Sequence, residues 1–258
     1  MESKSAERLF SEYLAVIKRL RRECPWDNRQ THESLQPHLL EETYEVLDAI
    51  AEKNPEHLRN ELGDLLLHIA LQTEIASEEK AFTMADVLAY SIEKMIRRHP
   101  HIFGDVEVDG EREVRKNWET IKRQEGKTSI VDGVPTELPA LIKAQRVQEK
   151  AAAVGFDWRD KDDVWKKVTE ELEELSAAEQ EGRKEDIERE FGDVLFALVN
   201  YSRFLGVHAE FALRQSVDKF GRRFQFIEES LSQKGKSPAE STLEEMDLLW
   251  NEAKKRIG

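Results

Sequence analysis

Two groups of acidic residues, spaced alike in distant parts of the chain, are the residues best able to do chemistry. Each group reads EExxE, then fifteen further residues, then ExxD. The groups are Glu41, Glu42, Glu45, Glu61 and Asp64, and Glu170, Glu171, Glu174, Glu190 and Asp193. Every member of the second group lies 129 residues after its counterpart. One acidic stretch usually indicates a solvated helix face, but a pattern repeated at all five positions favours a metal site.

The spacing predicts that the acids of each group converge. Residues three or four apart on an α-helix share a face, so EExxE and ExxD each present a row of carboxylates. Lys53 lies midway between the two halves of the first group, and Gly182 lies midway in the second. If the chain reverses at each midpoint, antiparallel helices bring Glu45 opposite Glu61, and the second group folds alike. Glycine is a common helix terminator, which supports a turn at Gly182.

Converging carboxylates repel one another, and such a cluster is costly in a partly dry groove unless cations compensate it. Oxygen ligands on a rigid helical scaffold suit Mg²⁺, with Mn²⁺ as a substitute. The single cysteine, Cys24, excludes a zinc site built on cysteines. Each acidic hairpin is therefore predicted to bind Mg²⁺.

Two further groups also recur in both halves and carry positive charge. Lys94, Arg97 and Arg98 recur as Lys219, Arg222 and Arg223, and Trp118 with Lys122 recurs as Trp250 with Lys254. Arg and Lys side chains bind phosphate oxygens that metal ions do not cover, so we predict that these groups contact the substrate. The tryptophans could stack on a nucleobase or anchor the last helix of each half in its core, and core anchoring is the commoner role.

The elements that would position these residues are helices, because apolar residues recur three and four apart and only 12 Gly and 7 Pro interrupt the chain. Helices are predicted over 5–23, 33–53, 55–80, 83–98, 111–124, 138–153, 161–181, 184–206, 208–232 and 240–256. The one strand candidate runs from Ile102 to Val108. The predicted fold is all-α, with an N-terminal domain over 1–125, a linker over 126–137 and a homologous C-terminal domain over 138–258.

Charge and composition exclude several classes of protein. The chain carries 39 Lys+Arg against 53 Asp+Glu, a net charge of −14. This excess argues against a nucleic-acid surface, because polyanions bind clustered positive charge. No apolar stretch approaches the roughly 20 residues of a membrane helix, and the polar stretch from Met1 to Arg8 does not resemble a signal peptide. We therefore expect a cytoplasmic protein without nucleic-acid or membrane partners.

The sequence resembles the MazG family of nucleoside triphosphate pyrophosphohydrolases, in its two-domain bacterial form, over essentially the whole chain. The doubled EExxE and ExxD pattern is shared by the wider all-α NTP pyrophosphatase superfamily. Four other sequence motifs narrow the resemblance to MazG itself: CPWD from Cys24, RRHPHIF from Arg97, VGFDW from Val154 and KFGRRF from Lys219.

The resemblance implies Mg²⁺-dependent hydrolysis of a (deoxy)nucleoside triphosphate to the monophosphate and pyrophosphate, in nucleotide-pool house-cleaning or regulation. It also implies a homodimer, because one helical hairpin does not close a four-helix bundle alone. The implied metal ligands are Glu42, Glu45, Glu61 and Asp64, and Glu171, Glu174, Glu190 and Asp193. The implied phosphate and nucleotide contacts are Lys167, Lys219, Arg223 and Trp250, and in the N-terminal half Lys94, Arg98 and Trp118. His38 stands where the first half would match Lys167.

The hypothesis for catalysis assigns one glutamate of each group as the base that orients the attacking water. The candidates are Glu41 and Glu170, beside Glu42 and Glu171. Water attacks the α-phosphorus and pyrophosphate leaves. Two alternatives stay open: a nucleotide sensor or interaction module without turnover, and a relative that hydrolyses phosphoribosyl-ATP or dUTP. The sequence does not identify a regulatory protein partner.

Overall fold

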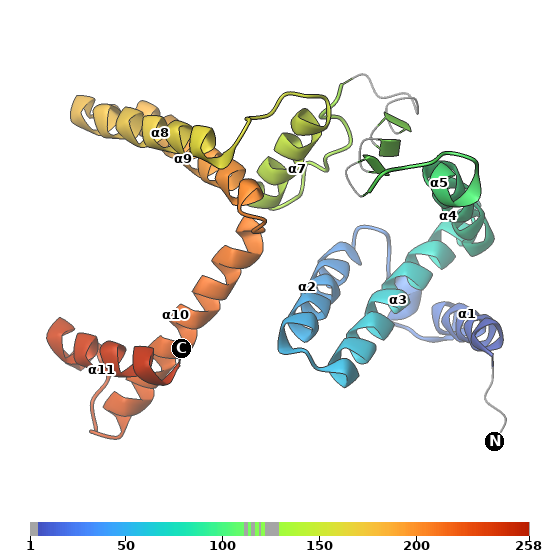
Figure 1. The fold of residues 1–258 in the computed structure, drawn as a ribbon. Helices are drawn as coiled ribbons and strands as arrows, with labels where there is room; N and C mark the ends of the chain where they lie inside the picture. Colours follow the sequence, from blue (N-terminus) through green and yellow to red (C-terminus); the bar gives the residue numbers. More distant parts are fainter. Residues whose placement is uncertain (1–4, 111–112, 115–116, 119, 122–128, 258) are drawn as a thin grey trace. The chain divides into compact units, whose positions relative to one another are not determined.

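The computed structural model describes residues 5–110, 113–114, 117–118, 120–121 and 129–257, and its regular elements in these ranges are all helices (Figure 1). The chain divides into two compact units, Met1–Glu107 and Val108–Gly258. The predicted all-α class is confirmed. The domain boundary at residue 125 and the linker over 126–137 stay predictions.

The first unit is organised around a helical hairpin. Its elements are α1 (Ala6–Glu23), the 3₁₀ turn η1 (Asp27–Arg29), α2 (Gln36–Glu52), α3 (Pro55–Glu78), α4 (Met84–Arg98) and α5 (Pro100–Phe103). Helices α2 and α3 form the hairpin, and α1 and α4 pack against α3. Pro55 suits the first turn of α3, and the Asn54 side chain accepts hydrogen bonds from the backbone N–H groups of Glu56 and His57. The sequence thus starts α3 directly after the turn at Lys53.

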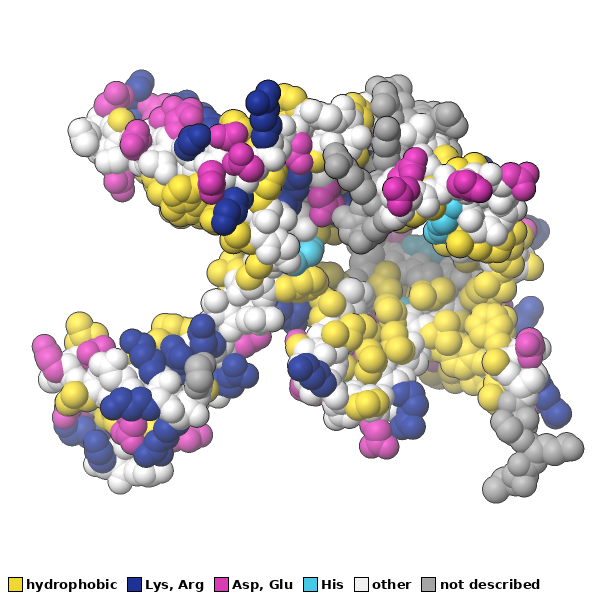
Figure 2. All heavy atoms as spheres, viewed as in Figure 1, with side chains coloured by type: hydrophobic (Ala, Val, Ile, Leu, Met, Phe, Trp, Pro, Cys, Tyr) yellow, Lys and Arg dark blue, Asp and Glu magenta, His cyan; other side chains and the backbone are white. Residues whose placement is uncertain are grey.

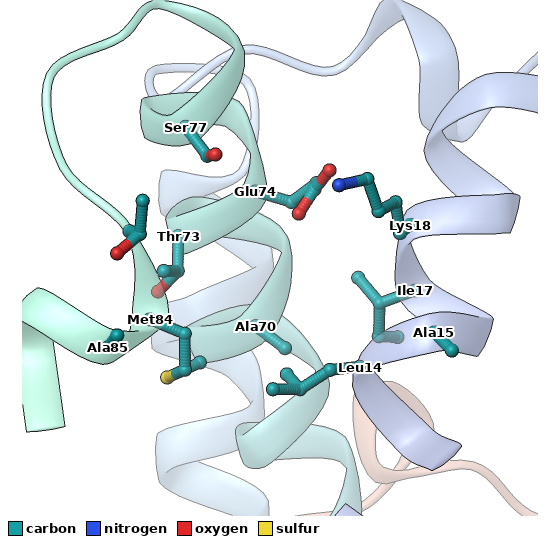
Figure 3. A pocket seen from close by; sticks show the side chains of 11 residues that line it. Leu14, Ala15, Ile17, Lys18, Ala70, Thr73, Glu74, Ser77, Met84 and Ala85 are labelled. Carbon is teal, nitrogen blue, oxygen red and sulfur yellow. The ribbon is translucent and has the colours of Figure 1, made fainter. Parts of the chain in front are cut away.

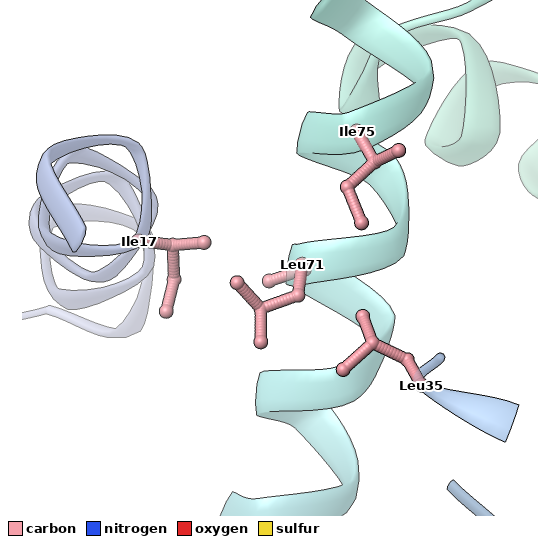
Figure 4. Packing of buried hydrophobic residues seen from close by; sticks show 5 residues of the cluster. Ile17, Leu35, Leu71 and Ile75 are labelled. Carbon is pink, nitrogen blue, oxygen red and sulfur yellow. The ribbon is translucent and has the colours of Figure 1, made fainter. Parts of the chain in front are cut away.

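A small apolar core holds α1 against α3. Ile17 of α1 packs with Leu35 and with Leu71 and Ile75 of α3, and each of these side chains is buried (Figure 4). Their spacing on α3 is that of one helix face. This core leaves the opposite end of the α2–α3 hairpin, where the acids lie, outside the apolar contacts.

A buried arginine adds polar contacts to the same junction. Arg21 is 6% exposed and pairs with Glu78, with Nη2 2.6 Å from Oε2. Its Nη1 donates to the backbone carbonyls of Asp27 and Gln30. A buried guanidinium is costly unless its N–H groups are satisfied, so these bonds fix α1, η1 and the end of α3 together.

The second unit repeats the hairpin and adds a longer C-terminal pair of helices. Its elements are α7 (Ala140–Ala153), α8 (Lys161–Glu181), α9 (Lys184–Phe204), α10 (Ala209–Ser232), the 3₁₀ turn η2 (Pro238–Glu240) and α11 (Leu243–Arg256). Helices α8 and α9 form the hairpin, α7 packs against α9 and α10, and α10 packs against α11. Asp160 caps α8 by accepting from the backbone N–H groups of Asp162 and Asp163. Gly182 ends α8 in the left-handed conformation, as its position between the acids predicted.

Trp250 belongs to the core between α10 and α11. Ile227, Leu231 and Leu249 are buried there, and Trp250 and Phe224 pack against them. Trp250 is only half-buried, so one part of its ring anchors α11 and the rest remains accessible.

The strand candidate over Ile102 to Val108 is wrong. Pro100 opens the short helix α5, and the backbone N–H groups of Ile102 and Phe103 donate to the carbonyl of His99. Proline fixes φ near the helical value, which favours a helical turn over an extended start. The chain from 104 to 109 has no regular structure.

Two other predictions can be compared with the structure only over the residues that it describes. The helix predicted over 111–124 includes residues outside that description, so it stays a prediction. Among the described residues, no helix is both long enough and apolar enough to cross a membrane.

The two hairpin turns provide a matched test of backbone conformation. Lys53 (φ 56°) and Gly182 (φ 73°) both adopt the left-handed conformation, which costs a non-glycine residue roughly 1–2 kcal/mol. We expect Lys53→Gly to raise the free energy of unfolding by roughly 0.5–1 kcal/mol, after the entropy cost of glycine. We expect Gly182→Ala to lower it by about 1 kcal/mol, because a Cβ there meets open space and only the backbone changes. Urea unfolding followed by circular dichroism measures both, and changes of the same sign would contradict the shared turn conformation.

Candidate metal centres and phosphate-binding residues

The N-terminal hairpin brings three carboxylates to one point. Glu42 and Glu45 lie on α2 and Glu61 lies on α3, and one oxygen of each is within 4.8 Å of the others. Glu61 is only 8% exposed, whereas Glu45 is exposed. The predicted convergence across the turn is therefore present, with one buried and one accessible ligand on facing helices.

This convergence raises the pKa of two of the acids. Burial raises the pKa of Glu42, and the negative charges of Glu45 and Asp64 raise it further. The pKa of Glu45 is raised first by its hydrogen bond with Glu61 and then by burial and by neighbouring acids. At both carboxylates, burial and the neighbouring acids therefore outweigh any compensating positive charge.

An unpaired buried oxygen shows that the N-terminal cluster fits a cation. Glu42 Oε2 is buried and has no hydrogen-bond partner. An uncompensated buried carboxylate oxygen is costly, and a hard divalent cation with oxygen ligands would satisfy it. The donor set, three carboxylates, is the kind that Mg²⁺ and Mn²⁺ prefer.

The C-terminal hairpin repeats the arrangement. Glu171 and Glu174 on α8 and Glu190 on α9 each place one oxygen within 4.8 Å of the others. Glu171 is 7% exposed, and Glu174 is exposed. Burial raises the pKa of Glu174, and the charges of Glu171 and Glu190 add to the effect. The two hairpins therefore offer the same three ligands in the same places.

Asp64 and Asp193, the fourth predicted ligand of each half, lie outside the sets of three converging carboxylates found among the described residues. Both are exposed. Asp64 still contributes charge, since it raises the pKa of Glu42 and, after burial, that of Tyr13. Their assignment as metal ligands stays a prediction.

Cations contact the acids of the C-terminal cluster. Lys167 Nζ lies 2.7 Å from Glu170 and 2.7 Å from Glu171. These two hydrogen bonds raise the pKa of Lys167. Arg189 Nη2 lies 2.9 Å from Glu190, and the same contact raises the pKa of Arg189. Lys167, which was expected to contact phosphate, is thus held on the predicted base, Glu170, and on a predicted metal ligand, Glu171.

Imidazoles contact the acids of the N-terminal cluster. His57 lies between two carboxylates, with Nδ1 2.7 Å from Glu52 and Nε2 3.2 Å from Glu61. The hydrogen bond that His57 donates to Glu52 raises the pKa of His57. His68, which is 5% exposed, has Nε2 3.7 Å from Glu42.

One basic residue of α10, Arg223, lies near Trp250 of α11. The guanidinium of Arg223 stands 5.7 Å from the centre of the Trp250 ring. Lys and Arg side chains gather over these two helices (Figure 2). Within the part of the chain that the structure describes, no ion pair joins Lys219, Arg222 or Lys254 to the C-terminal acids. Lys219, Arg222 and Lys254 therefore remain available for an anionic ligand.

The corresponding N-terminal residues are less completely described. Lys94 lies 5.2 Å from the ring of Tyr90, and Arg97 pairs with Glu93 at 2.9 Å. Arg98 and Trp118 are half-buried. Lys122 lies outside the described residues. The structure therefore leaves the substrate-binding role of this group as a prediction.

Two open grooves in the first unit differ in their relation to the acids. A groove of about 330 Å³ lies between α1, α3 and α4, with Lys18 and Glu74 directed toward one another across it (Figure 3). Its other lining residues are apolar or hydroxyl-bearing, so it lacks a cluster for catalysis. A groove of about 290 Å³ includes His68 and His32 and therefore adjoins the acidic cluster.

Sequence reasoning did not single out two contacts of the clusters. His57 precedes Glu61 by four residues, so helical spacing could have indicated their contact. Arg189 is next to Glu190 in sequence, and adjacent residues on a helix do not normally face each other, so spacing gave no signal for that pair.

The chain is similar to proteins of one family. Residues 30–103 and 160–226 match the family described as MazG nucleotide pyrophosphohydrolase domain, and these segments contain the two acidic hairpins. The chain is 44% identical to the nucleoside triphosphate pyrophosphohydrolase/pyrophosphatase MazG of Thermotoga maritima, over 97% of this chain and 98% of that protein. It is 41% identical to the nucleoside triphosphate pyrophosphohydrolase of Escherichia coli K12, over 94% of this chain and 96% of that protein. A solved structure, a MazG-related protein from Thermotoga maritima, aligns with a TM-score of 0.40 and 26% identity, over 44% of this chain and 98% of that chain.

The raised pKa values predict how stability depends on pH without divalent cations. A carboxyl whose pKa is raised takes up protons on folding, so its contribution to stability is present at low pH and is lost as pH rises above the ordinary value of 4.5. We expect Glu45→Gln to reduce the fall in melting temperature between pH 5 and pH 7, and millimolar Mg²⁺ to reduce it in the unsubstituted chain. Thermal unfolding in chelator-treated buffer measures both.

Glu240→Gln is the control for this experiment. The Ser237 side chain and backbone lower the pKa of Glu240, so its contribution to stability is present at neutral pH and is lost as pH falls through the lowered pKa. We expect its substitution to lower the melting temperature at pH 7 without responding to Mg²⁺. An identical pH profile for Glu45→Gln and the unsubstituted chain would contradict the electrostatic account of the cluster.

Proposed function

The chain belongs to the MazG nucleotide pyrophosphohydrolase family, and we propose that it is a Mg²⁺-dependent enzyme that hydrolyses nucleoside triphosphates to monophosphate and pyrophosphate. The observation that carries the proposal is the convergence of three carboxylates in each hairpin, together with the buried, unpaired oxygen of Glu42 in the N-terminal one. Relatives of nearly the same length bear the name nucleoside triphosphate pyrophosphohydrolase. We further propose a role in clearing or regulating the nucleotide pool.

The proposed metal ligands are the converging acids of each half. In the C-terminal half these are Glu171, Glu174 and Glu190, assisted by Asp193, and in the N-terminal half they are Glu42, Glu45, Glu61 and Asp64. Bound Mg²⁺ would supply Lewis acidity toward the triphosphate oxygens and the attacking water. The exposed ligand of each set faces solvent, which leaves the ion accessible to a substrate.

The reaction uses an exposed glutamate beside each cluster as base. Glu170 in the C-terminal half, or Glu41 in the N-terminal half, accepts a proton from water as the water oxygen attacks the α-phosphorus. The bond from the α-phosphorus to the bridging oxygen breaks, and pyrophosphate leaves with that oxygen. Lys167, Lys219 and Arg223 stabilise the charge that develops on the leaving group.

We propose that the enzyme is a homodimer because, in the described parts of the chain, each hairpin leaves an apolar face exposed. On α9, Phe191, Leu195 and Leu198 are 55%, 41% and 41% exposed and share one face at spacings of four and three. On α3, Leu62 and Ile69 occupy the equivalent positions and are 49% and 44% exposed. Two hairpins packed through such faces form a four-helix bundle, and exposed apolar stripes of this kind commonly mark an interface. The proposed occupant is the same hairpin of a second copy.

An activity assay tests the proposed reaction. We expect each NTP, incubated with Mg²⁺ and resolved by anion exchange, to give monophosphate and pyrophosphate. The double variant Glu45→Gln and Glu174→Gln should lower kcat/KM by about 100-fold or more, because charge stabilisation of the transition state is lost in both halves. Glu173→Gln, an exposed acid beside Glu174 but outside the converging set, should retain activity.

The products of this assay also separate the alternatives. A nucleotide sensor without turnover would bind NTP and release no pyrophosphate. A relative specialised for phosphoribosyl-ATP or dUTP would turn over only that compound. Diphosphate and phosphate as products, or no turnover of any NTP, would refute the proposal.

Sedimentation velocity tests the dimer. We expect the unsubstituted chain to sediment as a dimer and Phe191→Glu to shift it toward monomer, because a carboxylate would be buried in the interface. Leu243→Glu alters a residue that is 75% exposed on α11, outside the hairpin, and should leave the dimer intact. A monomeric unsubstituted chain at micromolar concentration would overturn this part of the proposal.

A further inference from the structure

The two acidic clusters have matching ligands but differ in the charges that contact them. In the C-terminal cluster, Lys167 bridges Glu170 and Glu171 at 2.7 Å each. Arg189 contacts Glu190 at 2.9 Å, although its side chain is 64% exposed and the pair is correspondingly weak. The Lys167 pair is stronger, because the Glu171 side chain is only 9% exposed.

Neither cation has a counterpart in the N-terminal half. At the positions 129 residues earlier, the sequence has His38 in place of Lys167 and Asn60 in place of Arg189. His38 is 3.8 Å from Glu41, too far for a hydrogen bond, and Asn60 carries no charge. Among the described residues, no ion pair joins a Lys or Arg side chain to the N-terminal acids, whose contacts are imidazoles: His57 at 3.2 Å from Glu61 and His68 at 3.7 Å from Glu42.

A buried imidazole also points to a ligand at the N-terminal cluster. His68 is 5% exposed, with Nε2 directed toward Glu42 at 3.7 Å and with Nδ1 lacking a hydrogen-bond partner. Glu42 Oε2 is buried and lacks a partner as well. The position equivalent to His68 in the C-terminal half holds Ala197, so this pair exists in one half only.

From this contrast, and resting on the proposed metal-dependent function, we infer that the N-terminal cluster binds a divalent cation in the absence of nucleotide. In the C-terminal cluster, Lys167, aided by Arg189, acts as an internal cation that must be displaced before a metal ion binds. A metal ion that arrives alone breaks the Lys167 pair without replacing it. A metal-bound triphosphate offers the same ammonium group new phosphate oxygens, so the exchange is favourable only when nucleotide is present.

Lys167 is thus a specificity-determining residue that makes the C-terminal site respond to the metal–nucleotide complex and not to the free ion. The N-terminal site, without such a residue, responds to the ion itself. The two halves then bind Mg²⁺ in different circumstances despite the same three carboxylates.

Titration of Mn²⁺ into the full chain without nucleotide tests the inference. Mn²⁺ is chosen because its binding can be followed by electron paramagnetic resonance as well as by calorimetry. We expect one tight class of sites that Glu61→Gln removes and Glu190→Gln leaves in place. Should Glu61→Gln not fold, as judged by circular dichroism, Glu45→Gln replaces an exposed ligand of the same cluster and serves the same purpose. If Glu190→Gln removed this class of Mn²⁺ sites as completely as Glu61→Gln does, the inference would be overturned.

A second arm isolates Lys167. Lys167→Met should create a second class of Mn²⁺ sites without nucleotide and strengthen Mn²⁺ binding at the C-terminal cluster by about tenfold, because a charge-assisted hydrogen bond no longer competes. Lys166→Met is the matched control: Lys166 pairs with Asp163 at 2.8 Å, outside the cluster, and its loss should leave Mn²⁺ binding unchanged. If Lys167→Met binds Mn²⁺ as the unsubstituted chain does, Lys167 does not exclude the free ion.

The third arm adds a non-hydrolysable α,β-methylene NTP. In the unsubstituted chain, this analogue should bring about the second class of Mn²⁺ sites, and Glu190→Gln should abolish it. Absence of that second class with the analogue would contradict the displacement of Lys167. These binding readouts do not depend on turnover, so asymmetric Mn²⁺ binding in a chain that fails the NTP assay would refute the proposed reaction and leave the inference standing. If both clusters bind Mn²⁺ equally without nucleotide in a chain that hydrolyses NTP, the inference is refuted and the proposed reaction stands.

Discussion

Repulsion between carboxylates across each helical hairpin is the constraint on which the rest of the structure depends. Glu42 and Glu45 face Glu61, and their raised pKa values show that burial and like charge oppose ionisation there. Rigid helices and a fixed turn hold the acids together despite this repulsion. The apolar contacts of α1 with α3 and the buried Arg21 supply the stability that the hairpin itself does not.

The two halves place different groups against their repelling carboxylates. The C-terminal cluster has cations of the chain in contact with its acids, whereas the N-terminal cluster has imidazoles and an unpaired oxygen. Other cations of the second unit, among them Lys219 and Arg223, form no ion pairs with the acids in the described parts of the chain, and Arg223 lies 5.7 Å from the Trp250 ring. The charge of a bound ligand would therefore compensate the acids and cations that the hairpin alone leaves unpaired.

Most of the hairpin could be predicted from sequence because its physics is local. Helical spacing predicted the convergence of Glu45 with Glu61, and glycine preference predicted the turn at Gly182. The same spacing would have revealed the contact of His57 with Glu61. The contact of His68 with Glu42 depends on how two helices rotate about their axes, and short-range rules do not determine that rotation. The helix α5 was missed because the apolar run after Pro100 looked extended, although proline favours a helical start there.

The hairpin turns have a consequence for how the chain can be altered. Lys53 and Gly182 lie equally far in sequence from the acids that face each other, and the tip residues Asn54 and Arg183 beside them are exposed. Lengthening both arms by the same number of helical turns moves the tip outward and leaves the pairing register of the acids unchanged, whereas one extra residue in a single arm rotates its acids by about 100°. The tips are therefore where an inserted segment, a fluorescent label or a fused domain is best accommodated. The fifteen-residue spacing is one member of a series of lengths compatible with the same metal-binding geometry.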